Sequence, residues 1–336
     1  MLCMIKTAII GAGGISIAHI TALNKLDNVK VVAVMDINPE NAKQKAELCG
    51  AQVYDKMEDF LDKVDMIHLL TPPSKRVEYA IKAMKAGKHI LCEKPISSTV
   101  SDAEQMVDAA EKYGVHFMMA FNHRFRDGYR MLQEAVKSGE LGDVINFWSH
   151  RLGTGVGFGK YKLSHSWRTD PNLVCGMSIE SLSHDVDMMV GAVGNVTDVR
   201  ANTLGTIKEL PKFDNNSNAV FRLACGGTGL IHASWSSHIS SSARGVIGTK
   251  GTAVVEGDDL WDFMQFRIKT EDMPYTKIIQ LNDRFDNSSY YNENKYFLEC
   301  IEKNQKPIPS GEDGLQVLKV CLAIVESNSK DIIVDI

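Results

Sequence analysis

Short apolar runs alternate with longer stretches of helical periodicity over the first 122 residues of the chain. The runs have the length and composition of buried strands, and most of the longer stretches end at a glycine, a residue that often closes helices. Such alternation is typical of a parallel sheet assembled from βαβ units. The expected strands are residues 7–10, 29–35, 52–54, 66–70, 89–92 and 115–121, and the expected helices after the second strand are 39–49, 57–62, 77–86 and 100–113.

The pattern changes after Asn122, where strand-like segments dominate and helices become few. This half is expected to form a mostly antiparallel sheet with helices on one face. Strand 219–223 carries large residues on both sides, so the other face is expected to be covered by self-association of the protein. The expected strands are 144–151, 196–204, 219–224, 228–235, 244–247, 253–256, 263–268, 277–281 and 332–334, and the expected helices are 125–138, 290–301 and 314–326.

The length of 336 residues exceeds that of one typical domain, and the change of pattern marks the expected boundary. Residues 1–122 are predicted to form an α/β domain with a doubly wound parallel sheet of the Rossmann type. Residues 123–336 are predicted to form an α+β domain with a large, open, mostly antiparallel sheet, which binds substrate and mediates oligomerisation.

Composition narrows the function classes. The formal net charge of −5 argues against binding of nucleic acid or of an anionic membrane surface. No apolar run approaches the roughly 18 residues of a membrane span, and the N-terminus runs directly into the first expected strand without the pattern of a signal peptide. The seven scattered cysteines have no metal-site spacing and indicate reduced thiols in a cytoplasmic protein.

The first expected strand feeds a glycine cluster, Gly11-Ala12-Gly13-Gly14, and then Ile15 and a helical pattern. In a dinucleotide-binding turn the first glycine permits the tight turn and the second lets the backbone approach a pyrophosphate, which the helix N-terminus attracts. Ser16 takes the place of the usual third small residue. A glycine-rich turn without a ligand is the alternative reading of this stretch alone.

Asp36 ends the second expected strand, 25 residues after Gly11. An acid at this place can accept hydrogen bonds from the adenosine ribose and would repel a 2′-phosphate, so it favours NAD over NADP. The following Ile37-Asn38-Pro39 adds no cation for that phosphate. The alternative is an aspartate that caps the next helix.

Further polar residues end the other strands: Thr71-Pro72, Glu93-Lys94 and Asn122. Ligands of open parallel sheets bind at the carboxyl ends of the strands, and this convergence indicates a single binding edge. Lys94 precedes Pro95, whose fixed φ stiffens the turn. Such a lysine can hold a substrate hydroxyl and stabilise a developing alkoxide, although an ordinary surface lysine is the simpler reading.

In the second half, Glu180 and His184 stand four residues apart, which on a helix places them on one face. A neutral histidine is the usual proton acceptor near neutral pH, and a neighbouring carboxylate orients it. Asp187 is a competing partner for the imidazole. A solvated helix face or a metal pair are the alternatives, but no third metal ligand is evident, so no metal is expected.

With these residues the sequence resembles the Gfo/Idh/MocA oxidoreductase family, through a resemblance that covers nearly the whole chain. Its most specific part is Gly87-Lys88-His89 followed by Cys92-Glu93-Lys94-Pro95; the other matching parts are the glycine turn, Asp36, Thr71-Pro72, Asn122 to Phe125, Trp167-Arg168 and Glu180, His184 and Asp187. The resemblance implies a Rossmann half, an open-sheet half that mediates dimers or tetramers, a catalytic lysine at Lys94 and a catalytic histidine at His184.

Three positions depart from the family pattern. Glu180 stands where the inositol and sugar dehydrogenases usually have aspartate, the glycine run before it is reduced to Cys175-Gly176-Met177, and Arg76 replaces a common histidine after Thr-Pro. These departures affect the expected substrate and leave the expected fold unchanged.

The resemblance and the chemistry together imply an NAD-dependent dehydrogenase acting on a hydroxyl-bearing carbon of a sugar, inositol or related polyol. His184 would take the hydroxyl proton, assisted by Lys94 and Glu180. The expected cofactor contacts are Gly11, Ala12, Gly13, Gly14, Ile15, Asp36, Ile37, Thr71, Pro72, Glu93, Lys94 and Asn122, and the expected substrate contacts are Lys94, Arg124, Tyr161, Trp167, Arg168, Glu180 and His184.

The stretch 153–167 has glycines at every second position from 153 to 159 and is expected to order over the substrate, with an exposed linker as the alternative.

Two other functions stay open. Some relatives hydrolyse glycosidic bonds through a transient oxidation by tightly held NAD, and others are NAD-binding sensors without catalysis. Retention of both Lys94 and His184 favours turnover.

Overall fold

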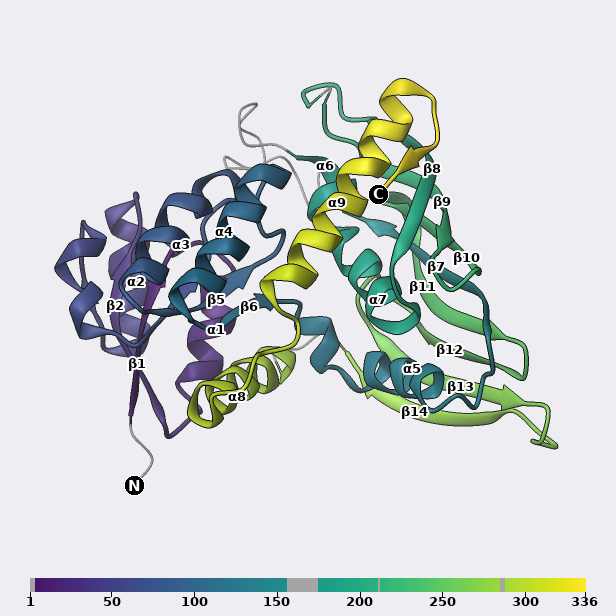
Figure 1. The fold of residues 1–336 in the computed structure, drawn as a ribbon, viewed down its shortest axis with the longest axis horizontal. Coiled ribbons are helices and arrows are strands. Elements are labelled where there is room, and N and C mark those ends of the chain that lie inside the picture. Colours follow the sequence, from purple (N-terminus) through teal and green to yellow (C-terminus); the bar gives the residue numbers. More distant parts are fainter. Residues whose placement is uncertain (1–3, 156–174, 211, 285–287) are drawn as a thin grey trace. The chain divides into compact units, whose positions relative to one another are not determined.

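The computed structural model describes residues 4–155, 175–210, 212–284 and 288–336, and the chain forms two compact units (Figure 1). The first unit consists of Met1–Asn122 together with Asn287–Gln316. The second consists of His123–Asp286 and Val317–Ile336. A segment from far along the chain therefore returns to the first unit.

The first unit is built on a six-stranded parallel sheet with the order β3-β2-β1-β4-β5-β6. The chain moves in one direction from β1 to β3 and in the other from β4 to β6, and right-handed crossovers then place the connecting helices on opposite faces. The sheet confirms the predicted Rossmann fold class. Its strands are β1 (Ile5–Ile10), β2 (Val29–Met35), β3 (Gln52–Val53), β4 (Met66–Leu69), β5 (His89–Glu93) and β6 (Phe117–Ala120).

Helix ends in this unit follow local chemistry. Asn38 caps α2 (Pro39–Cys49) by accepting hydrogen bonds from the amides of Glu40 and Asn41, and Gly50 closes the helix at φ 64°. Thr99 and Gly114 do the same for α4 (Val100–Tyr113). The expected helix at 57–62 is instead two 3₁₀ turns, Met57–Asp59 and Leu61–Lys63, because Phe60 between them leaves helical geometry. The remaining helices are α1 (Ser16–Leu23), α3 (Arg76–Lys85) and α8 (Ser288–Lys303).

The second unit contains a nine-stranded sheet with the order β14-β13-β12-β11-β7-β10-β9-β8-β15. The described pairs are antiparallel except β7 with β10, which confirms the prediction of a mostly antiparallel sheet. The strands are β7 (Val144–Thr154), β8 (Val196–Leu204), β9 (Asn216–Leu223), β10 (Thr228–Ser234), β11 (Ser236–Gly248), β12 (Gly251–Gly257), β13 (Phe263–Thr270), β14 (Lys277–Asp283) and β15 (Val334–Asp335).

Helices α5 (Asp127–Lys137) and α7 (Ser183–Val193) pack on one face of this sheet (Figure 1). Strand β9 shows the consequence, because buried and exposed residues alternate along it and Val220 on the outer side is 53% exposed. The turn Cys225-Gly226-Gly227 joins the antiparallel strands β9 and β10, with Gly226 at φ 89°. Helix α9 (Gly311–Lys330) begins in the first unit and continues into the second. No helix among the described residues has the length and apolar character to cross a membrane.

Candidate functional site

The glycine turn at the end of β1 has the shape that a dinucleotide requires. Gly11 adopts φ +98°, and a Cβ atom there would lie 2.7 Å from the carbonyl carbon of Leu70, so only glycine fits. A Cβ built on Gly13 or Gly14 meets nothing within 4 Å, which leaves open space beside the backbone at these positions. Ser16 is fully buried, and its hydroxyl donates to the Gly13 carbonyl at 2.6 Å.

Asp36 is tied to this turn by its carboxylate. One oxygen accepts from the Ala12 amide at 2.6 Å, and the other accepts from the Asn38 amide at 2.8 Å. Because Asn38 is the residue that caps α2, helix capping does not account for an acid at position 36. Each carboxylate oxygen retains a second lone pair, which suits two ribose hydroxyls. Ile37 beside it is 99% exposed.

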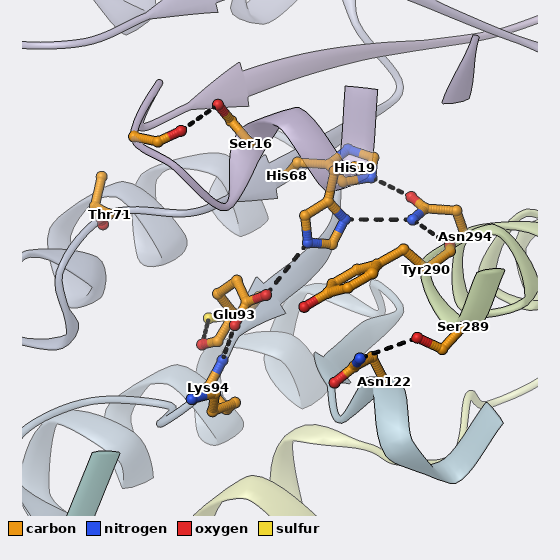
Figure 2. Close-up of polar contacts among 12 residues, drawn as sticks. Ser16, His19, His68, Thr71, Glu93, Lys94, Asn122, Ser289, Tyr290 and Asn294 are labelled. Atoms are coloured by element: carbon orange, nitrogen blue, oxygen red, sulfur yellow. Dashed lines mark hydrogen bonds and ion pairs between the residues drawn. The ribbon is translucent and has the colours of Figure 1, made fainter. Parts of the chain in front are cut away.

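The structure also places the other expected strand-end residues at the carboxyl edge of the parallel sheet. The Thr71 hydroxyl is buried and has no hydrogen-bond partner among the described residues, which marks a polar group that a ligand can satisfy. Asn122 follows β6, is buried, and donates its amide to the Ser289 hydroxyl of α8 at 3.0 Å (Figure 2). The open glycine turn, the Asp36 carboxylate and the Thr71 hydroxyl together fit a bound dinucleotide.

Lys94 lies in a turn whose backbone is held on both sides. The buried Arg76 guanidinium donates to the carbonyls of Glu93 and Pro95, and its Nε donates to the Thr71 carbonyl at 2.9 Å. The Lys94 amide donates to Glu93 Oε2 at 3.0 Å. Arg76, which departs from the family pattern, therefore fastens the turn that carries Lys94.

Glu93 is a buried carboxylate, 5% exposed. Burial alone would raise its pKa, but the hydrogen bond from His19 and the charges of Lys94 and Arg76 outweigh this and lower the pKa below its ordinary value. The Glu93 Oε1 to His19 Nε2 distance is 3.3 Å (Figure 2). An ionised carboxylate thus stands directly before Lys94.

In the second unit, Glu180 and His184 lie on two different helices. The short helix α6 (Gly176–Glu180) ends at Glu180, and α7 begins at Ser183 after a turn. The expectation of one continuous helix is therefore wrong, because Ser181 and Leu182 interrupt it, although both keep right-handed helical dihedrals. The Glu180 and His184 side chains are nevertheless largely buried, at 6% and 9% exposure.

The His184 imidazole lies flat against a second histidine. The His123 and His184 ring centroids are 4.4 Å apart at an interplanar angle of 16°, and Trp261 meets both rings edge-on. Burial lowers the His123 pKa well below its usual value, and the charges of three nearby arginines act in the same direction. A neutral imidazole therefore supports the candidate proton acceptor.

Asp185, the next residue, anchors the start of α7 to the sheet beneath it. Its carboxylate pairs with Arg151 of β7 at 2.7 Å and with Arg244 of β11 at 3.1 Å, and it accepts from Ser149 Oγ at 2.7 Å. Burial would raise the Asp185 pKa, but the two guanidinium charges lower it. The cluster carries one more positive than negative charge close to His184.

Two further carboxylates of the second unit, those of Asp187 and Asp214, accept hydrogen bonds that hold α6 and α7. Arg124 binds the buried Asp187 carboxylate through Nε and Nη2, at 2.7 to 3.1 Å, so the expected rival partner of His184 receives a guanidinium. Asp214 accepts from the amide and hydroxyl of Ser178 in α6, at 3.1 and 2.5 Å, and burial raises its pKa to about 6. These contacts place both helices that carry the candidate catalytic side chains.

The expected substrate contacts Tyr161, Trp167 and Arg168, and most of the glycine-rich stretch 153–167, lie outside the described residues. Within the described part of the chain, no group of three or more His, Cys, Asp or Glu side chains is arranged to hold a metal ion.

Sequence reasoning did not identify His19, Asn294, His123 or Asp185 as site residues. For some of them the sequence does contain an indication. A histidine in the apolar helix after a glycine turn is expected to be buried, and a buried polar side chain needs a polar partner; the same holds for charged residues at inward positions of strands. Because these partners come from distant parts of the chain, the sequence can indicate the residue but not the group that it contacts.

Two family models match the chain. The oxidoreductase family with the NAD-binding Rossmann fold, Gfo/Idh/MocA, matches residues 5–121, and the Gfo/Idh/MocA C-terminal domain matches residues 129–254. Together they cover most of the sequence.

Among curated proteins, glucose-6-phosphate 3-dehydrogenase of Bacillus subtilis is 32% identical over 50% of this chain, and the match spans only 47% of that protein. The myo-inositol 2-dehydrogenase of Thermotoga maritima is 24% identical over 96% of both chains. A solved structure of levoglucosan dehydrogenase in complex with NADH and L-sorbose superposes with a TM-score of 0.88 over 98% of both chains, at 22% identity. This likeness confirms the fold class, a Rossmann-type parallel sheet together with a mostly antiparallel sheet.

Proposed function

Because the chain belongs to the Gfo/Idh/MocA family of NAD-binding oxidoreductases, we propose that it oxidises a hydroxyl-bearing carbon of a sugar, inositol or related polyol with NAD. The observation that carries the proposal is the fastened Lys94 turn at the carboxyl edge of a sheet whose first turn has room for a dinucleotide. The relatives named above are dehydrogenases of such compounds.

In this proposal Gly11 to Ile15 would hold the pyrophosphate of the dinucleotide, Asp36 would bind the adenosine ribose, and Ile37 would contact the same end of the cofactor. Thr71, Pro72, Glu93, Lys94 and Asn122 line the remaining path. When bound, NAD accepts a hydride at its nicotinamide ring. The carboxylate at position 36 disfavours a 2′-phosphate, so NAD is preferred over NADP.

Removal of a hydride from an alcohol carbon must be matched by loss of the hydroxyl proton. We assign the proton acceptor to His184, whose plane is supported by His123. The Lys94 ammonium donates a hydrogen bond to the reacting oxygen and stabilises negative charge as the proton leaves. Glu180 orients the substrate or His184, and Arg124, Tyr161, Trp167 and Arg168 are proposed to contact the substrate.

Turnover can be tested with NAD and a panel of myo-inositol, levoglucosan and glucose 6-phosphate, the compounds in the names of relatives. NADH absorbance reports the reaction. Lys94→Met and His184→Ala should each lower kcat by about 10²- to 10⁴-fold while NADH binding is retained. The exposed Lys85→Met and His238→Ala serve as matched controls. Near-normal kcat in either site variant contradicts the role given to that residue.

The same assays separate the rival functions. Release of phenol from an aryl glycoside without net NADH would indicate a hydrolase. NADH binding without turnover of any sugar, polyol or glycoside would indicate a sensor.

We further propose that the exposed face of the nine-stranded sheet forms a homodimer or homotetramer interface. Support comes from apolar residues on that face, among them Val220 and Leu230 at 53% and 41% exposure. Val220→Asp should shift the mass measured by light scattering toward the monomer.

The free thiols of the described cysteines favour a cytoplasmic location, which fractionation of cells can test.

A further inference from the structure

A buried chain of polar side chains crosses the first unit and ends at Glu93 (Figure 2). Thr7 Oγ1 lies 2.9 Å from His68 Nδ1, and His68 Nε2 lies 2.6 Å from Asn294 Oδ1. Asn294 Nδ2 lies 3.3 Å from His19 Nδ1, and His19 Nε2 lies 3.3 Å from Glu93 Oε1. The two histidines and Asn294 are almost completely buried, so each polar atom depends on its neighbour in the chain.

The donor and the acceptor in each of these hydrogen bonds can be assigned from a single contact of Asn294. Asn294 Nδ2 also lies 2.8 Å from the Tyr290 carbonyl, which can only accept, so this atom is the amide nitrogen and the other is the oxygen. His68 must then carry its proton on Nε2. Burial lowers the His68 pKa to about 3, so His68 is neutral and its Nδ1 accepts from Thr7.

The second proton of the Asn294 amide points to His19 Nδ1, which therefore accepts. His19 carries its proton on Nε2 and donates it to Glu93. All bonds thus run in one direction, from the Thr7 hydroxyl to the Glu93 carboxylate. An amide cannot pass a proton from oxygen to nitrogen at ordinary cost, so the chain holds groups in place and does not conduct protons.

The last hydrogen bond of the series, from His19 to Glu93, joins the two functional parts of this unit. His19 lies on α1, the helix that follows the glycine turn, and Glu93 precedes Lys94. Asn294 comes from α8, which packs on α1 through Tyr290 against Ala18 and Ala22. The Lys94 charge lowers the Glu93 pKa, so by the same interaction the Glu93 carboxylate stabilises the Lys94 ammonium.

We propose that His19, Asn294 and Glu93 are positioning residues for Lys94. His19, with its tautomer set by Asn294, holds the Glu93 carboxylate, and this carboxylate fixes the Lys94 amide and keeps the side chain an ammonium. The inference rests on the proposed function, in which Lys94 contacts the substrate. It adds that α8, through Asn294, takes part in positioning that lysine.

The first test needs no substrate. Trace acetic anhydride labels lysines in proportion to their neutral fraction, and mass spectrometry of the peptide that contains Lys94 reports the rate, with Lys85 as internal reference. At about pH 8, Glu93→Gln should raise labelling of Lys94 about threefold or more, because a neighbouring negative charge is lost. His19→Leu removes the donor to the Glu93 carboxylate, and Asn294→Leu removes the amide that sets the tautomer of this donor. Both changes favour a neutral Glu93 and should move labelling in the same direction.

His19→Gln keeps an N–H group for Glu93 and should restore labelling to near the wild-type rate. His116→Leu is the matched control, because this imidazole stacks on His89 at the opposite end of β5. Labelling of Lys94 that is unchanged in His19→Leu and Glu93→Gln would overturn the proposal.

The second test uses turnover on the panel above. His19→Leu should lower kcat about tenfold or more with KM for NAD changed little, and His19→Gln should recover most of the loss. In the Lys94→Met background His19→Leu should have no further effect on kcat, since the two changes act through one group. An equal loss in both backgrounds would show a role independent of Lys94. If Lys94→Met itself turns over normally, the role proposed for Lys94 in turnover fails, and the labelling test still decides the present inference.

Discussion

The imidazole of His123 lies parallel to that of His184, with ring centroids 4.4 Å apart. His123 follows Asn122 and His184 lies in the first turn of α7, so two segments separated by some sixty residues meet ring to ring. The contact restricts the plane of the proposed proton acceptor without using its ring nitrogens.

Replacing His123 should therefore affect catalysis according to ring shape. His123→Leu removes the flat surface and should lower kcat/KM about tenfold, because a proton acceptor that rotates spends less time in the reactive geometry. His123→Phe keeps the stack and should lose no more than about threefold. Steady-state kinetics on a substrate found in the panel measures both. Equal losses in the two variants would show that the stack is not what matters.

Asp36 should determine the choice of cofactor. Asp36→Ala removes the carboxylate that is held by the Ala12 and Asn38 amides, and with it the repulsion of a 2′-phosphate. The Kd for NADH should rise about tenfold and that for NADPH should fall or stay constant. Fluorescence titration with both nucleotides gives the ratio. An unchanged ratio contradicts the preference for NAD.

Arg76 should be irreplaceable by lysine. Its guanidinium reaches the carbonyls of Thr71, Glu93 and Pro95 together, whereas the single ammonium of Arg76→Lys cannot span them. The variant should lose about 2 kcal/mol of unfolding free energy, since buried carbonyls are left unpaired. Urea denaturation measures the loss, with the exposed Arg130→Lys as control. A stability equal to that of the control would show that the clamp contributes little.

Asp185 should be essential for stability of the second unit. Asp185→Asn leaves Arg151 and Arg244 buried without a counter-charge, which typically costs about 3–5 kcal/mol. Asp127→Asn is the matched control, because Asp127 and Arg130 form an exposed pair and should change stability too little to detect. Thermal unfolding followed by circular dichroism compares the two. Similar midpoints for both variants would contradict the anchoring role of Asp185.

His68 should make the first unit sensitive to acid. Its pKa is about 3 in the folded chain and near the ordinary value of 6.5 when unfolded, so only the unfolded chain takes up this proton between these values. The stabilisation is complete above pH 6.5 and is lost as the pH falls toward 3. Between about pH 7.5 and pH 5 the loss should be about 2 kcal/mol.

The variant His68→Gln isolates this effect, because it cannot take up a proton. The difference in unfolding free energy between wild type and variant, measured by urea denaturation, should shrink by that amount over the same pH range. A difference that is independent of pH would mean that the His68 pKa is the same in the folded and unfolded chain, and a difference that grows as the pH falls would mean that His68 is protonated in the folded chain.

Much of the first unit follows from local sequence. The strand Val29–Met35 and the helices Pro39–Cys49 and Val100–Tyr113 have the predicted bounds, because buried strands are short apolar runs and helices end at residues such as Gly50 and Gly114 that accept a left-handed φ. The glycine turn and the polar residues at the strand ends could also be predicted from the sequence, because a parallel sheet brings the carboxyl ends of its strands to one edge.

Tertiary structure alone decided which distant side chains meet. Asn294 is 275 residues from His19, and the contact exists only because α8 returns to the first unit and packs on α1. The turn between Glu180 and His184 and the ion cluster of Asp185 were likewise set by packing against the nine-stranded sheet. Periodicity reports that a residue is buried, but the partner of a buried polar atom depends on how the whole chain closes around it.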